Sequence, residues 1–353
     1  MKITRVSYER LELTLAAPYT IAYETIAHAT NFVLKVETDT AHVGYGCAAP
    51  DPVVTGETAE TVAQAIHEPI SALLPGERPG AYARLLEELT KVIPTASSAR
   101  AMVDMALLDL LAKQAKVPLY QLLGGYREHM ITSVTIGIMS LDETMALATR
   151  YVEEGFLALK LKGGLNVDED ITKIKRLHTK FPRLKLRFDA NQGYTVGDTV
   201  AFAQATEHVG VEMIEQPLAV AQEQLLDELL PQVRTPIMVD EGLKTLDDAL
   251  RLTARRRTDM LNVKLMKVGG ITEAMSIQSV AQAARVPVMI GCVDECALGI
   301  AAGLHVALSR PIIKYADLDG HLDFVNDPFR GLFHLKQGVL YPTDEAGLGK
   351  ISL

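Results

Sequence analysis

Five charged residues recur at nearly equal intervals in the second half of the chain. They are Lys162, Asp189, Glu215, Asp240 and Lys264, and each ends or interrupts a short apolar run. Successive members lie about 25 residues apart, the length of one β-strand with its following helix. This spacing predicts that they occupy equivalent positions in successive units, at the C-terminal strand ends. A structural ring of ion pairs is the alternative, but burying such a ring costs desolvation energy and returns little stability.

The order of the residue types, one lysine, three acids and a second lysine, indicates acid–base chemistry beside a metal ion. Three carboxylates from neighbouring strands form an oxygen-only site that suits Mg²⁺, whereas zinc prefers histidine or cysteine. We therefore expect Asp189, Glu215 and Asp240 to hold one Mg²⁺. Lys162 and Lys264 would face each other across it, where nearby positive charge lowers a lysine pKa. Two bases on opposite faces of one carbon, with a metal-stabilised enediolate between them, would invert a stereocentre.

The elements that would position these residues are short apolar runs separated by amphipathic helical patterns. Eight such runs predict an α/β fold, a (β/α)7β barrel of TIM type over residues 126–325 with its active site at the C-terminal strand ends. A doubly wound sheet is the competitor, but "TIGIMSLDE" after the first run lacks a glycine-rich phosphate loop. The runs are 133–138, 156–162, 184–190, 211–217, 235–241, 260–266, 286–292 and 311–319.

The N-terminal part has a different pattern. Alternating runs up to about residue 50 predict strands, and residues 57 to 123 read as helices, including "SSARAMVDMALLDLLAKQ". We therefore expect an α+β capping domain over residues 1–125. Residues 326–353 are expected to form a C-terminal segment that returns to this cap.

Composition and charge argue against several classes of protein. The 353 residues carry a net charge of −9 and offer no basic stripe, so no nucleic-acid partner is expected. No apolar run is long enough to span a membrane and no signal peptide is evident, so we expect a cytoplasmic protein without a membrane partner. Cys47, Cys292 and Cys296 lack zinc spacing and are expected to be free thiols.

A second acidic motif follows the last predicted strand, in "YADLDGH". Asp317 and Asp319 are two residues apart and therefore share one face of the strand. Two carboxylates there suit a substrate that carries an ammonium group. A salt-bridged strand end is the alternative.

Together these motifs resemble the enolase superfamily, muconate-lactonizing subgroup, over essentially the whole chain. The matching segments are the K-x-K of "LKLK", "DANQG", "EQP", the "DE" pair and "NVKLMKVGG". Lysine bases with Mg²⁺-stabilised enediolates are known for this superfamily. Within the subgroup, the D-x-D motif and "GCVDECALG" resemble the dipeptide epimerases.

The resemblance implies a Mg²⁺-dependent enzyme that inverts the α-carbon of the C-terminal residue of a dipeptide. Asp317 and Asp319 would hold the free amino terminus. Lys160 would place positive charge near the substrate carboxylate, and Asn191 would support the metal ligands. Lys267 has strand parity opposite to the catalytic lysine three residues before it, so we expect it to point away and be exposed.

Specificity for the side chain is expected from the cap and the loop after the seventh strand. Glu24 and Asp51 lie in predicted cap loops, and Asp294 and Glu295 follow the seventh strand. These acids would favour basic or neutral side chains over acidic ones. His321 is expected to be a surface or loop residue.

Other functions stay open at this level. The same scaffold serves N-acylamino acid racemases, o-succinylbenzoate synthases and cycloisomerases, whose substrates carry no ammonium group. A Schiff-base lyase would use one lysine as nucleophile and need no metal triad, and a non-catalytic protein on this scaffold is a further alternative. The sequence leaves open the preferred dipeptide, the pathway and whether the chain forms a homo-oligomer.

Overall fold

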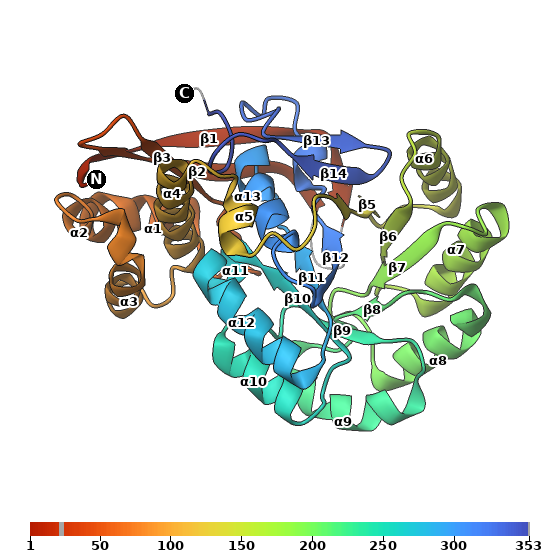
Figure 1. Cartoon of the computed structure of the whole chain (residues 1–353). Helices are drawn as coiled ribbons and strands as arrows, with labels where there is room; N and C mark the ends of the chain where they lie inside the picture. Colours follow the sequence, from red (N-terminus) through yellow and green to blue (C-terminus); the bar gives the residue numbers. More distant parts are fainter. Residues whose placement is uncertain (21–24, 352–353) are drawn as a thin grey trace.

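The computed structural model describes residues 1–20 and 25–351 and contains a large parallel sheet and a separate antiparallel sheet (Figure 1). The parallel sheet has eight strands, hydrogen-bonded in chain order from β5 to β12. Each of the eight predicted runs contains one of these strands, so the strand predictions are confirmed. The strands are β5 (Val134–Ile136), β6 (Ala158–Lys162), β7 (Lys185–Asp189), β8 (Ile214–Glu215), β9 (Ile237–Val239), β10 (Met260–Lys264), β11 (Val288–Gly291) and β12 (Ile313–Asp317).

The first and last strands of this sheet meet beside the start of β5. Thr132 forms a parallel bridge with Ala316, and the Ser133 backbone N–H donates to the Ala316 carbonyl at 3.2 Å. These contacts bring the two edges together and make the sheet a barrel. Side chains at the C-terminal strand ends therefore converge on one mouth, as predicted.

The interior deeper in the barrel is filled by apolar side chains. Met213, Met238, Met260 and Met289 form a buried cluster. The unbranched thioether side chain fills irregular space well, so these residues close the barrel below the strand ends.

The helices around the barrel begin where polar side chains satisfy their first backbone N–H groups. Ser140, Thr195 and Thr245 each form a capping box with the residue three positions later, and Asn166 caps its helix alone. No helix within residues 1–20 and 25–351 is long and apolar enough to cross a membrane. The helices are α6 (Leu141–Glu153), α7 (Val167–Lys180), α8 (Val196–Thr206), α9 (Leu226–Leu229), α10 (Leu246–Ala254), α11 (Leu265–Val268), α12 (Ile271–Ala284) and α13 (Ala297–Ala307).

The N-terminal part forms the predicted cap, an antiparallel sheet with helices packed against it. The sheet order is β1-β2-β3, and the long helix α4 lies against β3. Gly46 permits this close approach, because a Cβ at this position would lie 1.9 Å from the Met102 carbonyl oxygen. The elements are β1 (Ile3–Thr20), β2 (Thr25–Thr38), β3 (Val43–Ala48), α1 (Ala59–Ala65), α2 (Ser71–Leu73), α3 (Tyr82–Val92), α4 (Ser97–Ala115) and α5 (Leu119–Leu123).

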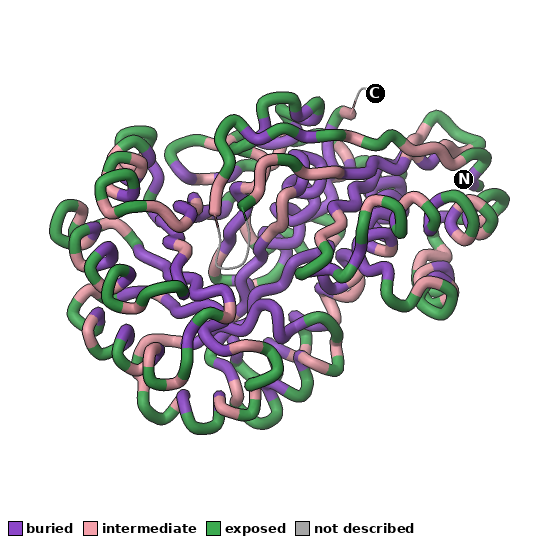
Figure 2. The backbone as a smooth tube through the Cα atoms, turned by 180° about the vertical axis from the view of Figure 1, so that it is seen from behind, coloured by how far each residue is buried: buried purple, intermediate pink, exposed green. Residues whose placement is uncertain are grey.

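Buried polar side chains join the cap to the barrel. Asp104 on α4 accepts hydrogen bonds from the backbone N–H and the hydroxyl of Thr272 at the start of α12. Asn31 on β2 accepts one from the Cys296 backbone N–H at the start of α13. Figure 2 shows that the buried positions continue from the barrel strands into this contact, whereas the outer helices alternate between buried and exposed residues. The cap is therefore fixed over one side of the barrel mouth.

The C-terminal segment contacts both the barrel and the cap. Its strands β13 (Phe333–Lys336) and β14 (Val339–Pro342) form a small sheet with β4 (Met130–Ile131). Farther along, the Leu348 backbone N–H donates to Asp109 on α4 at 2.8 Å. The domain limits 1–125, 126–325 and 326–353 themselves stay a prediction.

Candidate active site

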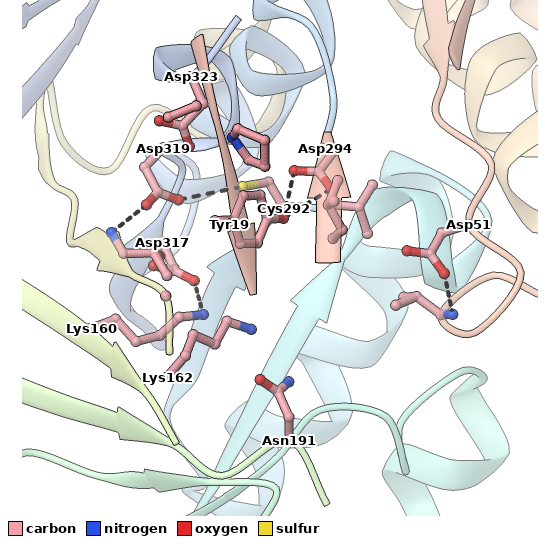
Figure 3. A pocket seen from close by; sticks show the side chains of 18 of the residues that line it. Tyr19, Asp51, Lys160, Lys162, Asn191, Cys292, Asp294, Asp317, Asp319 and Asp323 are labelled. Carbon is pink, nitrogen blue, oxygen red and sulfur yellow. Dashed lines mark hydrogen bonds and ion pairs between the residues drawn. The ribbon is translucent and has the colours of Figure 1, made fainter. Parts of the chain in front are cut away.

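A cavity of about 250 Å³ lies between the mouth of the barrel and the cap (Figure 3). The barrel contributes lysines and acids from its strand ends, and the cap contributes Tyr19 and Asp51. The predicted site residues that line it are Lys160, Lys162, Lys264, Asp317, Asp319, Asp51 and Asp294, together with Asn191.

The three predicted metal ligands lie side by side beneath this cavity. Asp189 and Glu215 are register partners at the ends of β7 and β8, and Asp240 directly follows β9. All three residues are 1% exposed. The Lys160 ammonium lies 3.5 Å from Asp189 Oδ2 and 3.5 Å from Glu215 Oε2, so it balances the charge of both.

The backbone turns sharply after two of these acids. Asn191 and Gln216 have positive φ angles of 43° and 35°, a conformation that non-glycine residues adopt rarely and mostly at constrained sites. Hydrogen bonds hold both turns. The Asn191 backbone N–H donates to Asp189 Oδ1 at 3.0 Å, and the Gln216 side chain accepts from the Asp240 backbone N–H at 2.9 Å. The "DANQG" motif thus holds the Asp189 carboxylate in place, and the "EQP" motif connects the end of β8 to Asp240 after β9.

Lys162 and Lys264 reach the cavity from opposite sides. Lys162 ends β6 and Lys264 ends β10, four strands away in a barrel of eight. The Lys162 ammonium is 2.9 Å from Asp189, and the Lys264 ammonium is 2.8 Å from Asp240. One ion can therefore lie between two amines that approach from opposite walls.

Charges in the site are strongly coupled. Burial lowers the pKa of Lys264, but Asp240 and Glu215 outweigh it and hold that pKa well above its usual value. Burial and the neighbouring Asp189 raise the pKa of Glu215 to about 8. The sequence predicts a lowered lysine pKa. With these acids as counterions, the pKa of Lys264 is raised instead.

Several buried oxygens at the floor lack hydrogen-bond partners among the described residues. They are Glu215 Oε2, Asn191 Oδ1 and Glu241 Oε2. An unpartnered buried oxygen is costly, and a hard cation satisfies such atoms. No three acidic, histidine or cysteine side chains in residues 1–20 and 25–351 are already arranged around a metal position, since ammonium groups stand between the carboxylates. The donor chemistry of Asp189, Glu215 and Asp240 fits Mg²⁺.

The expectation for Lys267 is wrong. Its side chain is buried, and its ammonium donates to Asp240 Oδ1 at 2.5 Å, to the Asp240 carbonyl and to the Asn262 carbonyl at 3.1 Å. Strand parity does not apply, because the chain leaves β10 at Lys264 and enters the short helix α11. Lys264 and Lys267 therefore bind the two oxygens of the same carboxylate.

The acidic pair after the eighth strand lines the cavity beside Lys160. Asp317 forms an ion pair with Lys160 and accepts a hydrogen bond from the Ser133 hydroxyl. Asp319 accepts one from the Thr135 backbone N–H at 2.6 Å, and its Oδ1 has only a weak contact of 3.8 Å with the Cys292 thiol. Asp319 thus keeps more free capacity for a substrate cation than Asp317 does.

Two of the four predicted specificity residues line the cavity. Asp51 and Asp294 line the cavity, and the Tyr19 hydroxyl donates to Asp294 at 2.8 and 2.9 Å. Glu295 is buried and does not line the cavity in this structure. Burial raises the pKa of its carboxyl to about 8, and the Lys264 ammonium lies close enough to oppose this rise, so the contact of Glu295 with substrate stays a prediction. Glu24 lies outside the described residues.

Two acids at the cavity were missed by the sequence analysis. Glu241 follows Asp240 directly, and the "DE" motif contained the signal for it. Asp323 lies in the loop after the eighth strand, and its carboxylate has no hydrogen bond or ion pair among the described residues. His321 lies two residues before Asp323 in the same loop, as expected, and packs edge-on against Phe333. No motif pointed to Asp323, because only the path of the folded loop brings it to the cavity.

Comparisons with known proteins identify the family of the chain. Residues 4–124 match the mandelate racemase / muconate lactonizing enzyme N-terminal domain, and residues 143–350 match the enolase C-terminal domain-like family. The L-Lys-D/L-Arg epimerase of Desulforapulum autotrophicum is 40% identical to this chain over 351 residues, 99% of each protein.

Solved structures show the same relationship. A dipeptide epimerase from Methylococcus capsulatus, complexed with Mg and the dipeptide L-Arg-D-Lys, has a TM-score of 0.96 and 36% identity and covers 99% of both chains. A substrate-liganded complex of the L-Ala-D/L-Glu epimerase from Bacillus subtilis has a TM-score of 0.96 and 34% identity, covering 99% of this chain and 98% of the other. The chain therefore belongs to the enolase superfamily, with N- and C-terminal domains of the mandelate racemase and muconate-lactonizing type.

Proposed function

We propose that this protein is a dipeptide epimerase that uses one Mg²⁺ per chain and inverts the α-carbon of the C-terminal residue. The observation that carries the proposal is the position of Lys162 and Lys264 on opposite walls of one cavity, above three buried carboxylates. A racemising enzyme needs this arrangement, because one amine must remove a proton from one face and the other must supply a proton to the opposite face.

The residues of the chain divide the work. Asp189, Glu215 and Asp240 would hold the Mg²⁺, which when bound supplies positive charge to offset the charge left on the substrate carboxylate as the α-proton leaves. Lys162 takes or gives the proton on one face and Lys264 on the other. Lys160 adds positive charge at the floor of the cavity. The cap covers the mouth and limits the access of water.

The acidic side of the cavity would select the substrate. Asp319, with Asp317 behind it, would bind the free ammonium group of the dipeptide. Asp51 and Asp294 carry negative charge on the cap side, and Asp323 adds a third acid without a described partner. Long-range attraction to three separated acids favours a substrate with several cations. We therefore propose dipeptides with basic side chains as the preferred class, which is also the class named for the Desulforapulum and Methylococcus relatives.

The proposal also covers the cellular location, the small-molecule partner and the oligomeric state. We place the enzyme in the cytoplasm, where unpaired thiols persist, and all three cysteines are unpaired in the structure. Its small-molecule partner would be the dipeptide, and a homo-oligomer stays a possibility to be measured.

The test is deuterium incorporation in D₂O with Mg²⁺, read by mass spectrometry and chiral chromatography. L-Arg-L-Lys and L-Lys-L-Arg should take up one deuteron at the second α-carbon and yield both epimers, and EDTA should abolish the exchange. N-acetylated versions of the same dipeptides serve as matched controls because they lack the ammonium group. Exchange of the acetylated compounds at the same rate would favour an N-acylamino acid racemase and overturn the dipeptide assignment.

A further inference from the structure

Two cysteines that are far apart in sequence meet at the contact between cap and barrel. Cys47 lies on β3 of the cap, and Cys296 is the residue that precedes α13 of the barrel. Their Sγ atoms are 3.5 Å apart, although 249 residues separate them along the chain. Both residues are fully buried. The mechanism proposed above uses neither thiol.

One side chain connects this pair to the cavity. Asn31 Oδ1 accepts a hydrogen bond from the Cys296 backbone N–H at 2.8 Å and from the Cys47 thiol at 3.6 Å. Asn31 Nδ2 donates to the Asp294 carbonyl at 3.0 Å. Asp294 lines the cavity, so the thiol pair lies directly behind a loop that faces the proposed substrate.

We propose that Cys47 and Cys296 are a redox pair, which an oxidant of the peroxide class converts to a disulfide between the cap and the seventh strand loop. In the first step one thiol loses its proton and its sulfur attacks a peroxide oxygen, which breaks the O–O bond, releases water and leaves a sulfenic acid. In the second step the other thiol displaces water from that sulfur and the S–S bond forms. Both sulfurs are oxidised, and the peroxide is reduced to two water molecules.

Burial sets the speed of this reaction. The neighbouring Cys296 thiol and burial raise the pKa of Cys47, and the thiolate is the reactive form. Oxidation is therefore slow and requires the contact between cap and barrel to open briefly. Once one sulfur is oxidised, its partner is already adjacent, so cross-linking is faster than further oxidation. Reduction by a small dithiol reverses the bond.

The disulfide would change the stability of the whole chain. It would add a second covalent link between the cap and the barrel, between positions that are 249 residues apart in the sequence. A cross-link that closes a long loop stabilises the native state, so the melting temperature of the oxidised protein should rise by about 5 °C.

The test is a count of free thiols in the full-length protein before and after slow oxidation by hydrogen peroxide or diamide, followed by alkylation in denaturant and peptide mass spectrometry. We expect the count to fall from three to one, with a linked peptide that contains Cys47 and Cys296 and disappears on reduction. Cys292→Ala is the matched control, because it removes the third thiol and should leave the linked peptide intact.

Single substitutions of the pair give the complementary result. Cys47→Ser and Cys296→Ser should each abolish the linked peptide and the rise in melting temperature, and Cys47→Ala repeats the test if the serine variant folds poorly. Three alkylated thiols after prolonged oxidation, or a linkage that involves Cys292 instead, would overturn the proposal. The readout is independent of catalysis, so it stands whether or not the epimerase assignment is correct.

Discussion

Two regions of the cavity differ in how their charges are arranged. The floor consists of the lysines and acids at the barrel strand ends, and the cap side consists of Asp51 of the cap and of Asp294 and Asp323 in barrel loops that face the cap. On the floor, most charged groups come from strand ends and form ion pairs, as in the pairs Lys162–Asp189 and Lys264–Asp240. On the cap side, acids come from loops, and Asp323 has no ion pair within 4.0 Å among the described residues, although Arg150 lines the same cavity and opposes the rise in the pKa of Asp323 that partial desolvation causes. The floor is thus rigid and electrically balanced, and the cap side has an excess of negative charge. This difference suggests that the floor carries the chemistry and the loops carry the choice of substrate.

The largest effect is expected from removing either proposed base. Lys162→Ala and Lys264→Ala should each lower kcat by about 10³-fold or more, because the proton on one face then has no carrier. The two variants should differ in which epimer still exchanges its α-proton in D₂O, as followed by NMR. Lys180→Ala, at an exposed position on α7, is the matched lysine control. Equal exchange of both epimers in either base variant would show that the opposed amines do not act separately.

Metal binding is the next way to test the floor. Glu215→Gln keeps the size of the side chain but removes its charge. We therefore expect Mn²⁺ affinity, measured by electron paramagnetic resonance, to fall by about 10²-fold, and the enzymatic activity to fall with it. The Glu212→Gln variant changes an acid three residues earlier that pairs with Arg187 and should keep the metal. Undiminished Mn²⁺ binding by Glu215→Gln would separate this carboxylate from the metal site.

Lys267 tests whether the floor depends on its own counterions. The Lys267→Met variant leaves Asp240 with one ammonium contact in place of two, so the carboxylate can rotate, and metal affinity should fall about 10-fold to 100-fold. Lys267→Arg retains the charge and should recover part of this loss. If Lys267→Met keeps the melting temperature of the unmodified protein but binds Mn²⁺ more weakly, Lys267 has a positioning role. If only the melting temperature falls, its role is structural.

Prediction from the sequence succeeded where one periodic rule applied. Strand spacing and the alternation of side chains placed Lys162, Asp189, Glu215 and Lys264 at one mouth, because each is the last residue of its strand. The same rule failed for Lys267, where a helix begins directly after the strand and the direction of the side chain changes.

The cap side lay beyond such rules. Tyr19 and Asp323 are more than 300 residues apart in sequence, and only the path of the folded chain brings them to one cavity. Glu295, the loop residue next to Asp294, is buried beside the cavity lining, and its contact with substrate stays a prediction. Loops have no repeating period from which the direction of a side chain can be inferred.

Substituting acids on the substrate side should give smaller and more selective effects. Asp319→Asn should raise KM about 10-fold to 100-fold for every dipeptide, because the free ammonium group is common to all of them. Asp323→Asn should affect only substrates with basic side chains, by about 10-fold in kcat/KM. Measuring both variants on L-Arg-L-Lys and L-Ala-L-Ala separates the two roles. If Asp323→Asn weakened both dipeptides equally, Asp323 would belong to the ammonium site.

The smallest effect expected is the part of the pH dependence of substrate binding that differs between basic and neutral dipeptides. Burial raises the pKa of Asp294 to about 6. Asp323 is more exposed, and partial desolvation of its carboxyl together with the neighbouring Asp319 raises its pKa to about 7. A carboxyl with a raised pKa is protonated at lower pH and ionises as the pH rises, so its attraction for a cation grows between about pH 6 and pH 8. Burial and the neighbouring Asp317 also raise the pKa of Asp319 to about 6, so KM for both dipeptides should fall as Asp319 ionises. KM for L-Arg-L-Lys should fall several-fold further over this range. Asp323→Asn removes one of these titrating groups and should bring the pH profile of the basic dipeptide close to that of L-Ala-L-Ala. If the additional pH dependence of the basic dipeptide persisted in the variant, Asp323 would not be its source, and the assignment of side-chain selectivity to this acid would no longer hold.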